Sequence, residues 1–485
     1  MKNNNIGLIL GPLSFIIIQI LEIDGLSTEG QAILASTAWI AIWWITEAIP
    51  MAATSLLPIV LFPLTGGLDI KTTTTTYFSP LIVLFLGGLI IALAIEKWNL
   101  HQRIALNIIK TIGTNSSRII LGFMVATALL SMWISNTAST LMMLPIGLAI
   151  AKKVSDFKST STESANSFDK SLMLGIAYAA SIGGMASLIG TPTNAVFSAM
   201  SLELYNRVIT FSEWLSFGLP ISILLLFIGW IYLTKVIFKS DFGNMEKAKD
   251  EIKSELMALG KINYEEKLIL AVFLFTAISW ILRSFVLVKL LPGINDTVIA
   301  IFGALLLFVI PASRRGEKLM DWQTAERVPW GILLLFGGGL AVAAGFKHSG
   351  LADWLGTQLA FLGGMHFALI LFMLIIMVNF FTEITSNVAT VSVLLPILAS
   401  LSQSMGVHPF GLMAGACVAA SCAFMLPVAT PPNAIVYSSG YLTMNDMVKT
   451  GIWMNLISTV ILFLCIYFLM PIIWGIDLLQ FPSVF

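Results

Sequence analysis

Two short polar motifs interrupt apolar stretches of this chain, and both carry groups that bind ions. Ser135-Asn136-Thr137 recurs as Ser386-Asn387-Val388, and a proline follows each serine ten residues later. At a tip between two helices, such side chains cap the second helix, whose first amides carry about half a positive charge. A helix end of this kind binds a carboxylate or phosphate without a fixed cation. The hydroxyl and amide groups add further donors and acceptors.

A second pair of motifs places threonine before proline. GTPTNA over 190–195 is matched by ATPPNA over 429–434, at an offset of 239. Because proline removes a backbone donor and disrupts the preceding turn, Thr191-Pro192 and Thr430-Pro431 should break their segments. A break frees carbonyl oxygens, which hard cations such as sodium bind. Two polar tips and two broken helices predict an anion pocket flanked by two small-cation sites.

The four motifs lie in a duplicated unit. LFLGGLIIALAIEKWNL (84–100) aligns with LFGGGLAVAAGFKHSGL (335–351) at an offset of 251, which the Ser-Asn motifs share. The later offset of 239 means that the second copy has lost about twelve loop residues. Matching glycine- and proline-broken segments in two halves of a membrane chain are the best sequence indication of a transporter's binding site.

The composition is that of a polytopic membrane protein. Hydrophobic residues make up 57% of the chain and charged residues 11%, against about a quarter in soluble domains. Apolar stretches long enough to span a bilayer recur throughout. Zero net charge and no basic cluster give no indication of a nucleic-acid partner. Three cysteines in apolar segments and four scattered histidines predict no disulfide framework, metal centre or cofactor. The polar motifs contain no His or Cys, so an enzyme is not expected.

Charge distribution predicts the topology, because Lys and Arg concentrate on the cytoplasmic side. With the N-terminus inside, eleven predicted crossings place 21 of the 26 Lys and Arg in cytoplasmic stretches and leave the C-terminus outside. The crossings lie near 6–21, 32–48, 51–65, 78–96, 171–200, 215–238, 267–286, 296–311, 328–347, 411–439 and 451–470.

Two apolar segments remain, and each contains a Ser-Asn motif near its middle. Segment 118–152 has Lys and Arg on both sides, whereas segment 367–402 is flanked by residues 348–369 and 402–410, which have none. We therefore predict re-entrant hairpins that enter from opposite sides, so that the repeats are inverted. Non-helical backbone at that depth is tolerated only inside protein or along a cavity. The alternative for 118–152 is two ordinary spans with a tight external turn.

The predicted division is a first repeat with N-terminal spans over 1–238, a cytoplasmic linker over 239–266 and a second repeat over 267–485. The linker alternates in charge, which is typical of a solvated helix. Taken singly, each motif has a structural explanation, such as a helix cap or a proline kink. Glu47 and Glu383 fit either a proton relay or a capped structural carboxylate.

The chain resembles the divalent anion/sodium symporter family, which moves dicarboxylates, citrate or sulfate. The similarity covers nearly the whole chain and includes TEAIPMAATSLLPIVLFPL (46–64), TEITSNVATVSVLLP (382–396) and all four paired motifs. The resemblance implies an all-α membrane protein and a homodimer with an elevator mechanism. Each protomer would have a scaffold domain, about 1–97 and 215–347, and a mobile transport domain, about 118–200 and 367–470.

The resemblance also implies ligands at matching positions. The first sodium site would use Ser131, Ser135, Asn136 and the carbonyl of Gly190. The second would use Thr382, Asn387 and the carbonyl of Ala429, with Thr385 nearby. The substrate carboxylates would be bound by Ser135, Asn136, Thr137, Thr191 and Pro192 on one side, and by Ser386, Asn387, Val388, Thr430 and Pro431 on the other.

Two positions depart from the family pattern. Val388 replaces the common threonine, which removes a donor to a carboxylate, and Thr385 stands where a small residue is common. The expected function is uptake of succinate, malate, fumarate or 2-oxoglutarate across the plasma membrane, coupled to sodium. Sodium-independent exchange by the same fold stays open. Sulfate or citrate transport and an anion channel are further alternatives.

Overall fold

The computed structural model describes residues 2–113, 115–155, 162–238, 246–314 and 316–485. The described part is helical throughout and contains no β-strand; one isolated bridge joins Pro311 to Lys318. Six of the described helices are long and apolar enough to cross a membrane. The predicted all-α class is therefore confirmed.

The first half runs from an N-terminal group of helices into the first repeat. The N-terminal group comprises α1 (Lys2–Ile20), α2 (Thr28–Thr46), α3 (Met51–Thr54), α4 (Leu57–Thr65), α5 (Ile70–Thr75) and a 3-10 turn (Thr76–Phe78). The first repeat comprises α6 (Pro80–Lys97), α7 (Leu100–Ile112), α8 (Ser116–Ser131), α9 (Asn136–Ser155), α10 (Thr162–Gly184), α11 (Pro192–Tyr205) and α12 (Phe211–Ile231), which continues as a π-helical segment (Tyr232–Ile237).

A second group of helices separates the two repeats. It comprises α13 (Glu246–Ala258), α14 (Tyr264–Leu282), a π-helical segment (Arg283–Leu287), α15 (Val288–Leu290), α16 (Asp296–Val309) and α17 (Trp322–Ala325). The second repeat comprises α18 (Trp330–His348), α19 (Leu351–Leu359), a 3-10 segment (Ala360–Gly364), α20 (Phe367–Phe381), α21 (Asn387–Met405), α22 (Pro409–Ala420), α23 (Pro431–Tyr437), α24 (Met444–Leu464) and a π-helical segment (Cys465–Leu469). The short α25 (Met470–Trp474) follows.

The duplication extends beyond the motifs that the sequence showed. Helix α12 begins with a capping box between Thr210 and Glu213, and α24 begins with one between Thr443 and Asp446, at an offset of 233. Each box satisfies two amides that the helix leaves free at its start. Both helices also end in a π-helical segment, at the same offset. The repeats thus run from α6 to α12 and from α18 to α24.

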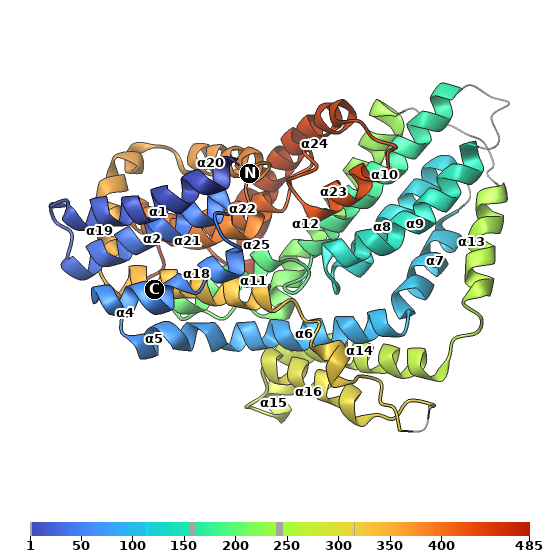
Figure 1. The fold of residues 1–485 in the computed structure, drawn as a ribbon, viewed down its shortest axis with the longest axis horizontal. Helices are drawn as coiled ribbons and strands as arrows, with labels where there is room; N and C mark the ends of the chain where they lie inside the picture. Colours follow the sequence, from blue (N-terminus) through green and yellow to red (C-terminus); the bar gives the residue numbers. More distant parts are fainter. Residues whose placement is uncertain (1, 114, 156–161, 239–245, 315) are drawn as a thin grey trace.

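Within each repeat, a Ser-Asn motif lies where one helix ends and the next begins, and we call each such pair of helices a hairpin. Helices α8 and α9 are separated by residues 132–135, and α20 and α21 by residues 382–386. The arms α8 and α20 have 16 and 15 residues, which at about 1.5 Å per residue fall short of a bilayer core of about 30 Å. The hairpins lie toward opposite ends of the molecule in Figure 1, with α8 and α9 on the right and α20 and α21 on the left.

The broken helices cross between the two repeats. Helix α10 packs against α8 and α9 of its own hairpin, whereas its continuation α11 packs against α21 and α22. Conversely, α22 packs against α20 and α21, and α23 packs against α9 and α10. Each hairpin is therefore covered by a helix of the other repeat.

A helix joins each hairpin to the apolar helix before it. Helix α7 follows α6, and α19 follows α18. Both begin after a residue with positive φ, which is Asn99 (φ 55°) in the first repeat and Gly350 (φ 74°) in the second. The left-handed region is open to glycine and, to a lesser degree, asparagine. The two residues are 251 positions apart, so the sharp bend belongs to the duplicated unit.

The linker is more closely packed than its charge pattern predicted. Of the expected segment 239–266, residues 239–245 lie outside the described part. Helix α13 packs against α7 and α9, and Ile252 is buried. Arg103 of α7 donates to Glu266 at 3.0 Å and to the carbonyl of Gly260 at 2.9 Å. The end of the linker is therefore fixed to α7.

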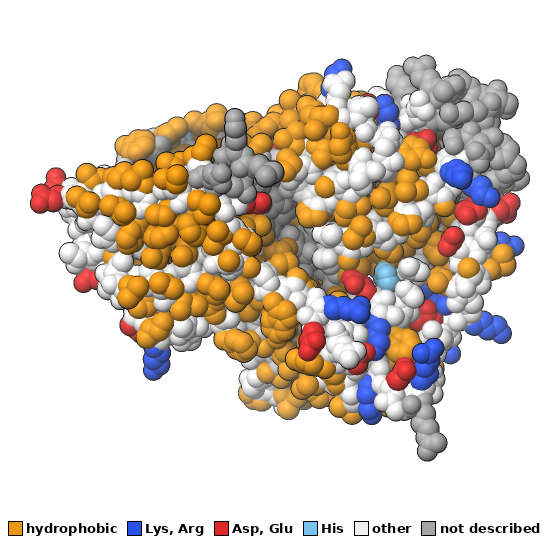
Figure 2. All heavy atoms as spheres, viewed as in Figure 1, with side chains coloured by type: hydrophobic (Ala, Val, Ile, Leu, Met, Phe, Trp, Pro, Cys, Tyr) orange, Lys and Arg blue, Asp and Glu red, His pale blue; other side chains and the backbone are white. Residues whose placement is uncertain are grey.

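One expected crossing is divided. Residues 51–65 form the short helices α3 and α4 with a break at Ser55 and Leu56, rather than one continuous helix. Hydrophobic side chains cover most of the face in Figure 2, while charged side chains gather at the right-hand end around α7 and α13. Outward-facing apolar residues such as Ile20, Phe285 and Leu305 fit contact with lipid.

Candidate functional site

At the first hairpin tip, two acceptor oxygen atoms lie within hydrogen-bond distance of one hydroxyl. Ser131 ends α8 and is fully buried, and its Oγ lies 2.6 Å from Asn136 Oδ1 and 2.7 Å from the carbonyl oxygen of Ala180. A hydroxyl has one proton, so it donates to only one of these two acceptors at a time. Ser135 precedes α9, and its Oγ accepts from the amide of Ala138 at 3.2 Å.

The second tip repeats this arrangement with threonine. Thr382 is fully buried, and its Oγ1 lies 2.6 Å from Asn387 Oδ1 and 3.2 Å from the carbonyl oxygen of Ala420. Ser386 caps α21 through the amide of Ala389. Oxygen-rich positions with too few protons are suited to a small cation. The structure thus places Ser131 with Asn136, and Thr382 with Asn387.

Gly190 lies against the first tip. A Cβ atom at Gly190 would be 2.4 Å from the carbonyl oxygen of Gly184 and 2.9 Å from that of Ser131. A Cβ atom at Gly184 would be 2.4 Å from Asn136 Oδ1. These approaches leave no room for a side chain. The four residues that line this point are Ser131, Asn136, Gly184 and Gly190, which include three members of the predicted first sodium site besides Ser135.

The corresponding position in the second repeat is Ala429, which is buried and accommodates a methyl group. Thr385 bonds to the carbonyl of Phe381 at 2.9 Å and pairs with Thr390 at 2.9 Å. Its hydroxyl is therefore already engaged within the hairpin.

Two asparagines hold the loops of the broken helices, and sequence reasoning did not single them out. Asn194 Nδ2 lies 2.7 Å from the carbonyl oxygen of Ser187 and 3.2 Å from that of Met185. Asn433 Nδ2 donates to the carbonyls of Ala423 and Leu426 at 3.1 and 3.0 Å. Both side chains are fully buried. Each is the fifth residue of its GTPTNA or ATPPNA motif, so the recurrence of asparagine at this position could have identified both residues from the sequence.

The prolines begin helices rather than bend them. Pro192 and Pro431 occupy the first positions of α11 and α23, where the missing amide costs nothing. Thr430 caps α23 by accepting from the amide of Asn433 at 3.4 Å, and Thr191 precedes α11 in an extended conformation. The breaks are the loops 185–191 and 421–430, which lie before the Thr-Pro pairs.

The predicted substrate-binding side chains differ in accessibility. Ser135 and Pro431 are exposed. Half-buried positions are Asn136, Thr137, Pro192, Ser386, Asn387 and Val388, whereas Thr191 and Thr430 are buried. Both tips are therefore reachable from outside the protein. The described contacts join tip residues within each repeat, and none joins one tip motif directly to the other.

Glu383 is a capped carboxylate. Its oxygens accept from the amides of Phe424, Met425 and Leu426 at 2.8 to 2.9 Å, and from Asn455 Nδ2 at 2.7 Å. Of the two interpretations that the sequence left open, these contacts support the structural one. Glu47, by contrast, ends α2 in a left-handed conformation.

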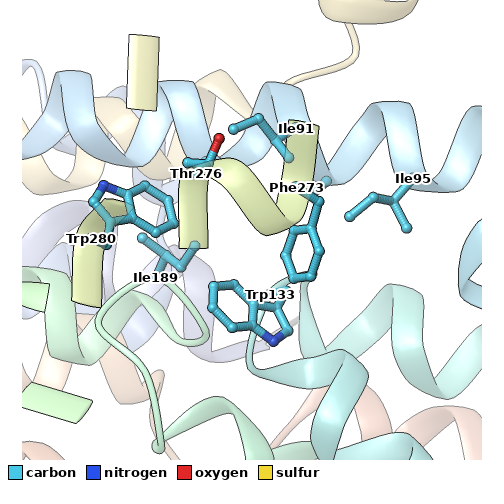
Figure 3. A pocket seen from close by; sticks show the side chains of 9 residues that line it. Ile91, Ile95, Trp133, Ile189, Phe273, Thr276 and Trp280 are labelled. Carbon is cyan, nitrogen blue, oxygen red and sulfur yellow. The ribbon is translucent and has the colours of Figure 1, made fainter. Parts of the chain in front are cut away.

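A small cavity lies behind the first tip, away from its polar groups. Figure 3 shows Trp133, which directly precedes Ile134 and Ser135, facing Phe273 and Trp280 of α14. The Trp133 ring packs edge-on against the Phe273 ring, with 4.8 Å between the ring centroids, and stacks on the Phe211 ring, with 5.7 Å between the centroids. The cavity encloses about 10 Å³, roughly the limit for one water molecule, and its lining is almost wholly apolar. It is too small for a carboxylate substrate.

Known proteins resemble this chain over nearly its full length. A family model described as the sodium:sulfate symporter transmembrane region matches residues 3–475. The sodium-dependent dicarboxylate transporter SdcS of Staphylococcus saprophyticus is 47% identical over 482 residues, covering 98% of this chain and 93% of that protein. The SdcS protein of Staphylococcus aureus strain bovine RF122 is 49% identical with the same coverage.

Two solved structures share the fold at low identity. MtrF of Neisseria gonorrhoeae, described as illuminating a class of antimetabolite efflux pumps, superposes with a TM-score of 0.58 at 14% identity, covering 93% of this chain and 96% of that one. The YdaH transporter of Alcanivorax borkumensis gives 0.57 at 14% identity, with coverage of 93% and 98%. The family match extends over almost the whole chain, and the chain therefore belongs to the sodium:sulfate symporter family of multi-pass membrane transporters and is not an enzyme.

Proposed function

We propose that this protein carries C4- and C5-dicarboxylates across the plasma membrane by symport with sodium. The observation that carries the proposal is the matched oxygen cluster at the two tips. In each, a buried hydroxyl lies within 2.6 Å of an asparagine oxygen and within 3.2 Å of a backbone carbonyl. A sodium ion bound among these oxygen atoms would offset their partial negative charges. The names of the SdcS relatives point to the same cation and substrate class.

The dianion would lie between the tips. Its carboxylates would be bound by the amide-rich starts of α9 and α21 and by the starts of α11 and α23, where helix dipoles favour negative charge. The side chains in contact would be Ser135, Asn136, Thr137, Thr191 and Pro192 on one side, and Ser386, Asn387, Val388, Thr430 and Pro431 on the other. Sodium would bind Ser131, Ser135, Asn136 and Gly190, and Thr382, Asn387 and Ala429, with Thr385 nearby.

The proposed mechanism moves the site rather than opening a channel through it. The hairpins and broken helices, about 118–200 and 367–470, would form the transport domain and slide against a scaffold of about 1–97 and 215–347. Support comes from the crossing of α11 and α23, which ties both hairpins into one unit. The left-handed bends at Asn99 and Gly350 would act as joints. The hairpins would be re-entrant from opposite sides, with the N-terminus cytoplasmic and the C-terminus extracellular, in a homodimer.

The test is uptake of labelled succinate by proteoliposomes. Empty vesicles and vesicles loaded with unlabelled succinate are compared, each with and without an inward sodium gradient. Sodium-driven accumulation in empty vesicles is the expected result. Uptake that requires internal dicarboxylate and does not depend on sodium would identify an exchanger. Exchange is the second candidate function because Val388 departs from the common threonine of the family pattern. Competition by sulfate and citrate then ranks the anions, and large unitary currents would instead indicate a channel.

A further inference from the structure

Glu383 has no equivalent carboxylate in the first repeat. It follows Thr382 directly, is 3% exposed, and accepts four hydrogen bonds from the loop 421–430 and from α24. All four partners are N–H donors, which is the surrounding of an ionised carboxylate rather than of a protonated acid. Within the described part of the chain, Glu383 takes part in no ion pair.

The matching position in the first repeat is apolar. Met132 lies 251 residues before Glu383, and Ser222 lies 233 residues before Asn455. There the loop is held by a neutral group, because Ser187 Oγ donates to the carbonyl of Met132 and accepts from the amide of Gly190. Ser222 donates instead to the carbonyl of Ile182, near the end of α10. A fixed negative charge is therefore not needed to build this loop.

The alignment of these positions has an independent check. A Cβ atom at Gly218 would meet the carbonyl oxygen of Met185 at 2.7 Å, and one at Gly451 would meet that of Phe424 at 2.3 Å. Gly451 follows Gly218 by 233 residues, and Phe424 follows Met185 by 239. The two loops are thus equivalent in space, and the carboxylate is a real difference between them.

The Glu383 carboxylate is linked to the hydroxyl of Thr382 and to the carbonyl of Ala429, which are two ligands proposed for the second sodium ion. Thr382, with its oxygen cluster, is its neighbour in the chain. On the other side, Leu426 donates its amide to Glu383 Oε2 at 2.9 Å, and the carbonyl of Leu426 accepts from the amide of Ala429 at 3.2 Å. Glu383 therefore fixes the loop segment that presents the carbonyl of Ala429.

We propose that Glu383 is a positioning residue that makes the second cation site bind sodium more tightly than the first. It fixes the loop that carries Ala429, and its charge favours a cation beside Thr382 because charges interact strongly where water is excluded. The inference rests on the proposed sodium coupling. It implies that sodium fills the site in the second repeat first.

The test compares loss of the charge with loss of one of its donors. Glu383→Gln removes the charge and one of the two acceptor oxygens, whereas Asn455→Ala keeps the charge and removes the Nδ2 donor, together with the Oδ1 that accepts from the amide of Phe424 at 3.2 Å. Sodium half-saturation and maximal rate of succinate uptake are measured in proteoliposomes at saturating substrate. Glu383→Gln should raise the sodium half-saturation about tenfold or more and recover most of its maximal rate at high sodium, whereas Asn455→Ala should raise it far less. A half-saturation within twofold of wild type, or a lost rate that no sodium concentration restores, would overturn the proposal.

The assignment to the second site is tested by combining variants. Glu383→Gln should be additive with Ser131→Ala and non-additive with Thr382→Val, because only the latter pair shares a site. The reverse pattern would contradict the assignment. If Glu383→Gln does not purify as folded protein, Glu383→Asp keeps the charge but shortens its reach, and an unchanged sodium half-saturation there would overturn the positioning role. Wild-type uptake that ignores sodium would refute the coupling itself, whereas a sodium-dependent wild type with an unaffected variant would refute this inference alone.

Discussion

The hydroxyl oxygen of Thr193, at the start of α11, lies 3.0 Å from that of Ser421, at the end of α22. Both residues are buried, and they belong to different repeats. One residue further along α11, Asn194 Oδ1 lies 3.5 Å from the sulfur of Cys417. The two repeats therefore meet through polar contacts at the breaks of their helices, beside the residues that we assign to the transport site.

Replacement of either tip asparagine should abolish uptake. Asn136→Ala and Asn387→Ala each remove a proposed sodium ligand, and the neighbouring hydroxyl keeps only its backbone carbonyl partner. We expect succinate uptake at background level from protein that elutes as the wild type does in gel filtration. Asn107→Ala on α7 is the matched control, because its side chain bonds only to a carbonyl of its own helix. Wild-type uptake by either tip variant would refute the site assignment.

The hydroxyl of Thr382 should matter and its methyl group should not. Thr382→Ser keeps the contact to Asn387, whereas Thr382→Val keeps the shape and loses the oxygen. We expect near-normal sodium half-saturation for the serine variant. For the valine variant we expect about a tenfold rise or more, since one buried hydrogen bond is worth about 1 kcal/mol and a cation ligand more. Equal behaviour of the two variants would contradict a sodium site at this tip.

Val388→Thr should change the ranking of dianions. The new hydroxyl would lie in the first turn of α21, half-buried beside Asn387, and could donate to a substrate carboxylate. The measurement is inhibition of labelled succinate uptake by malate, fumarate, 2-oxoglutarate, sulfate and citrate, for both proteins. An unchanged order would show that position 388 does not face the substrate.

Methyl groups at Gly218 and Gly451 should destabilise the protein. At each position a Cβ atom would come within 2.7 Å of a loop carbonyl oxygen, so the broken-helix loop must shift. Overpacking of this kind costs about 1–3 kcal/mol, and we expect Tm of purified Gly218→Ala and Gly451→Ala to fall by several degrees. Gly293→Ala is the control, since nothing lies within 4 Å of its Cβ and its φ is not in the left-handed region. A control that lost as much stability would invalidate the comparison.

Trp133 should be required for docking of the first tip against α14. Trp133→Ala would enlarge a cavity that now holds about 10 Å³, and losses of about 3–5 kcal/mol are usual when a packed aromatic side chain is truncated. We expect a lower Tm for Trp133→Ala and a smaller decrease for Trp133→Phe, which keeps a ring against Phe273. Identical Tm values for both variants and the wild type would show that the cluster contributes nothing to stability.

The duplication could be found from the sequence because it consists of short motifs at constant offsets. The Ser-Asn tips, the Thr-Pro pairs and the glycine-rich stretches of α6 and α18 all align by residue type alone. The helices α7 and α19 were missed because they are short and lie between strongly apolar segments. The capping boxes of α12 and α24 were missed because Thr210-Glu213 and Thr443-Asp446 differ in sequence but perform the same role.

The contacts that organise the site could not be read from spacing. Glu383 bonds to residues about forty and seventy positions further along the chain, and Asn194 bonds to a loop that precedes it. Such pairs depend on how the helices pack against one another, which the hydrophobic periodicity of the sequence does not predict. The division of 51–65 into α3 and α4 was hidden for a related reason, because hydropathy measures apolar content and not helix continuity.

The crossing of α11 and α23 has a consequence for biosynthesis. The first hairpin leaves the ribosome long before α23, which packs against α9. In the proposed re-entrant topology, α8 and α9 therefore enter the membrane before their polar tip is covered. Contacts between segments so distant in the chain form late in folding. A chain that stops translation after the first repeat would therefore present an unprotected polar tip in lipid, and cellular quality control should degrade it rather than store it as a stable half-molecule.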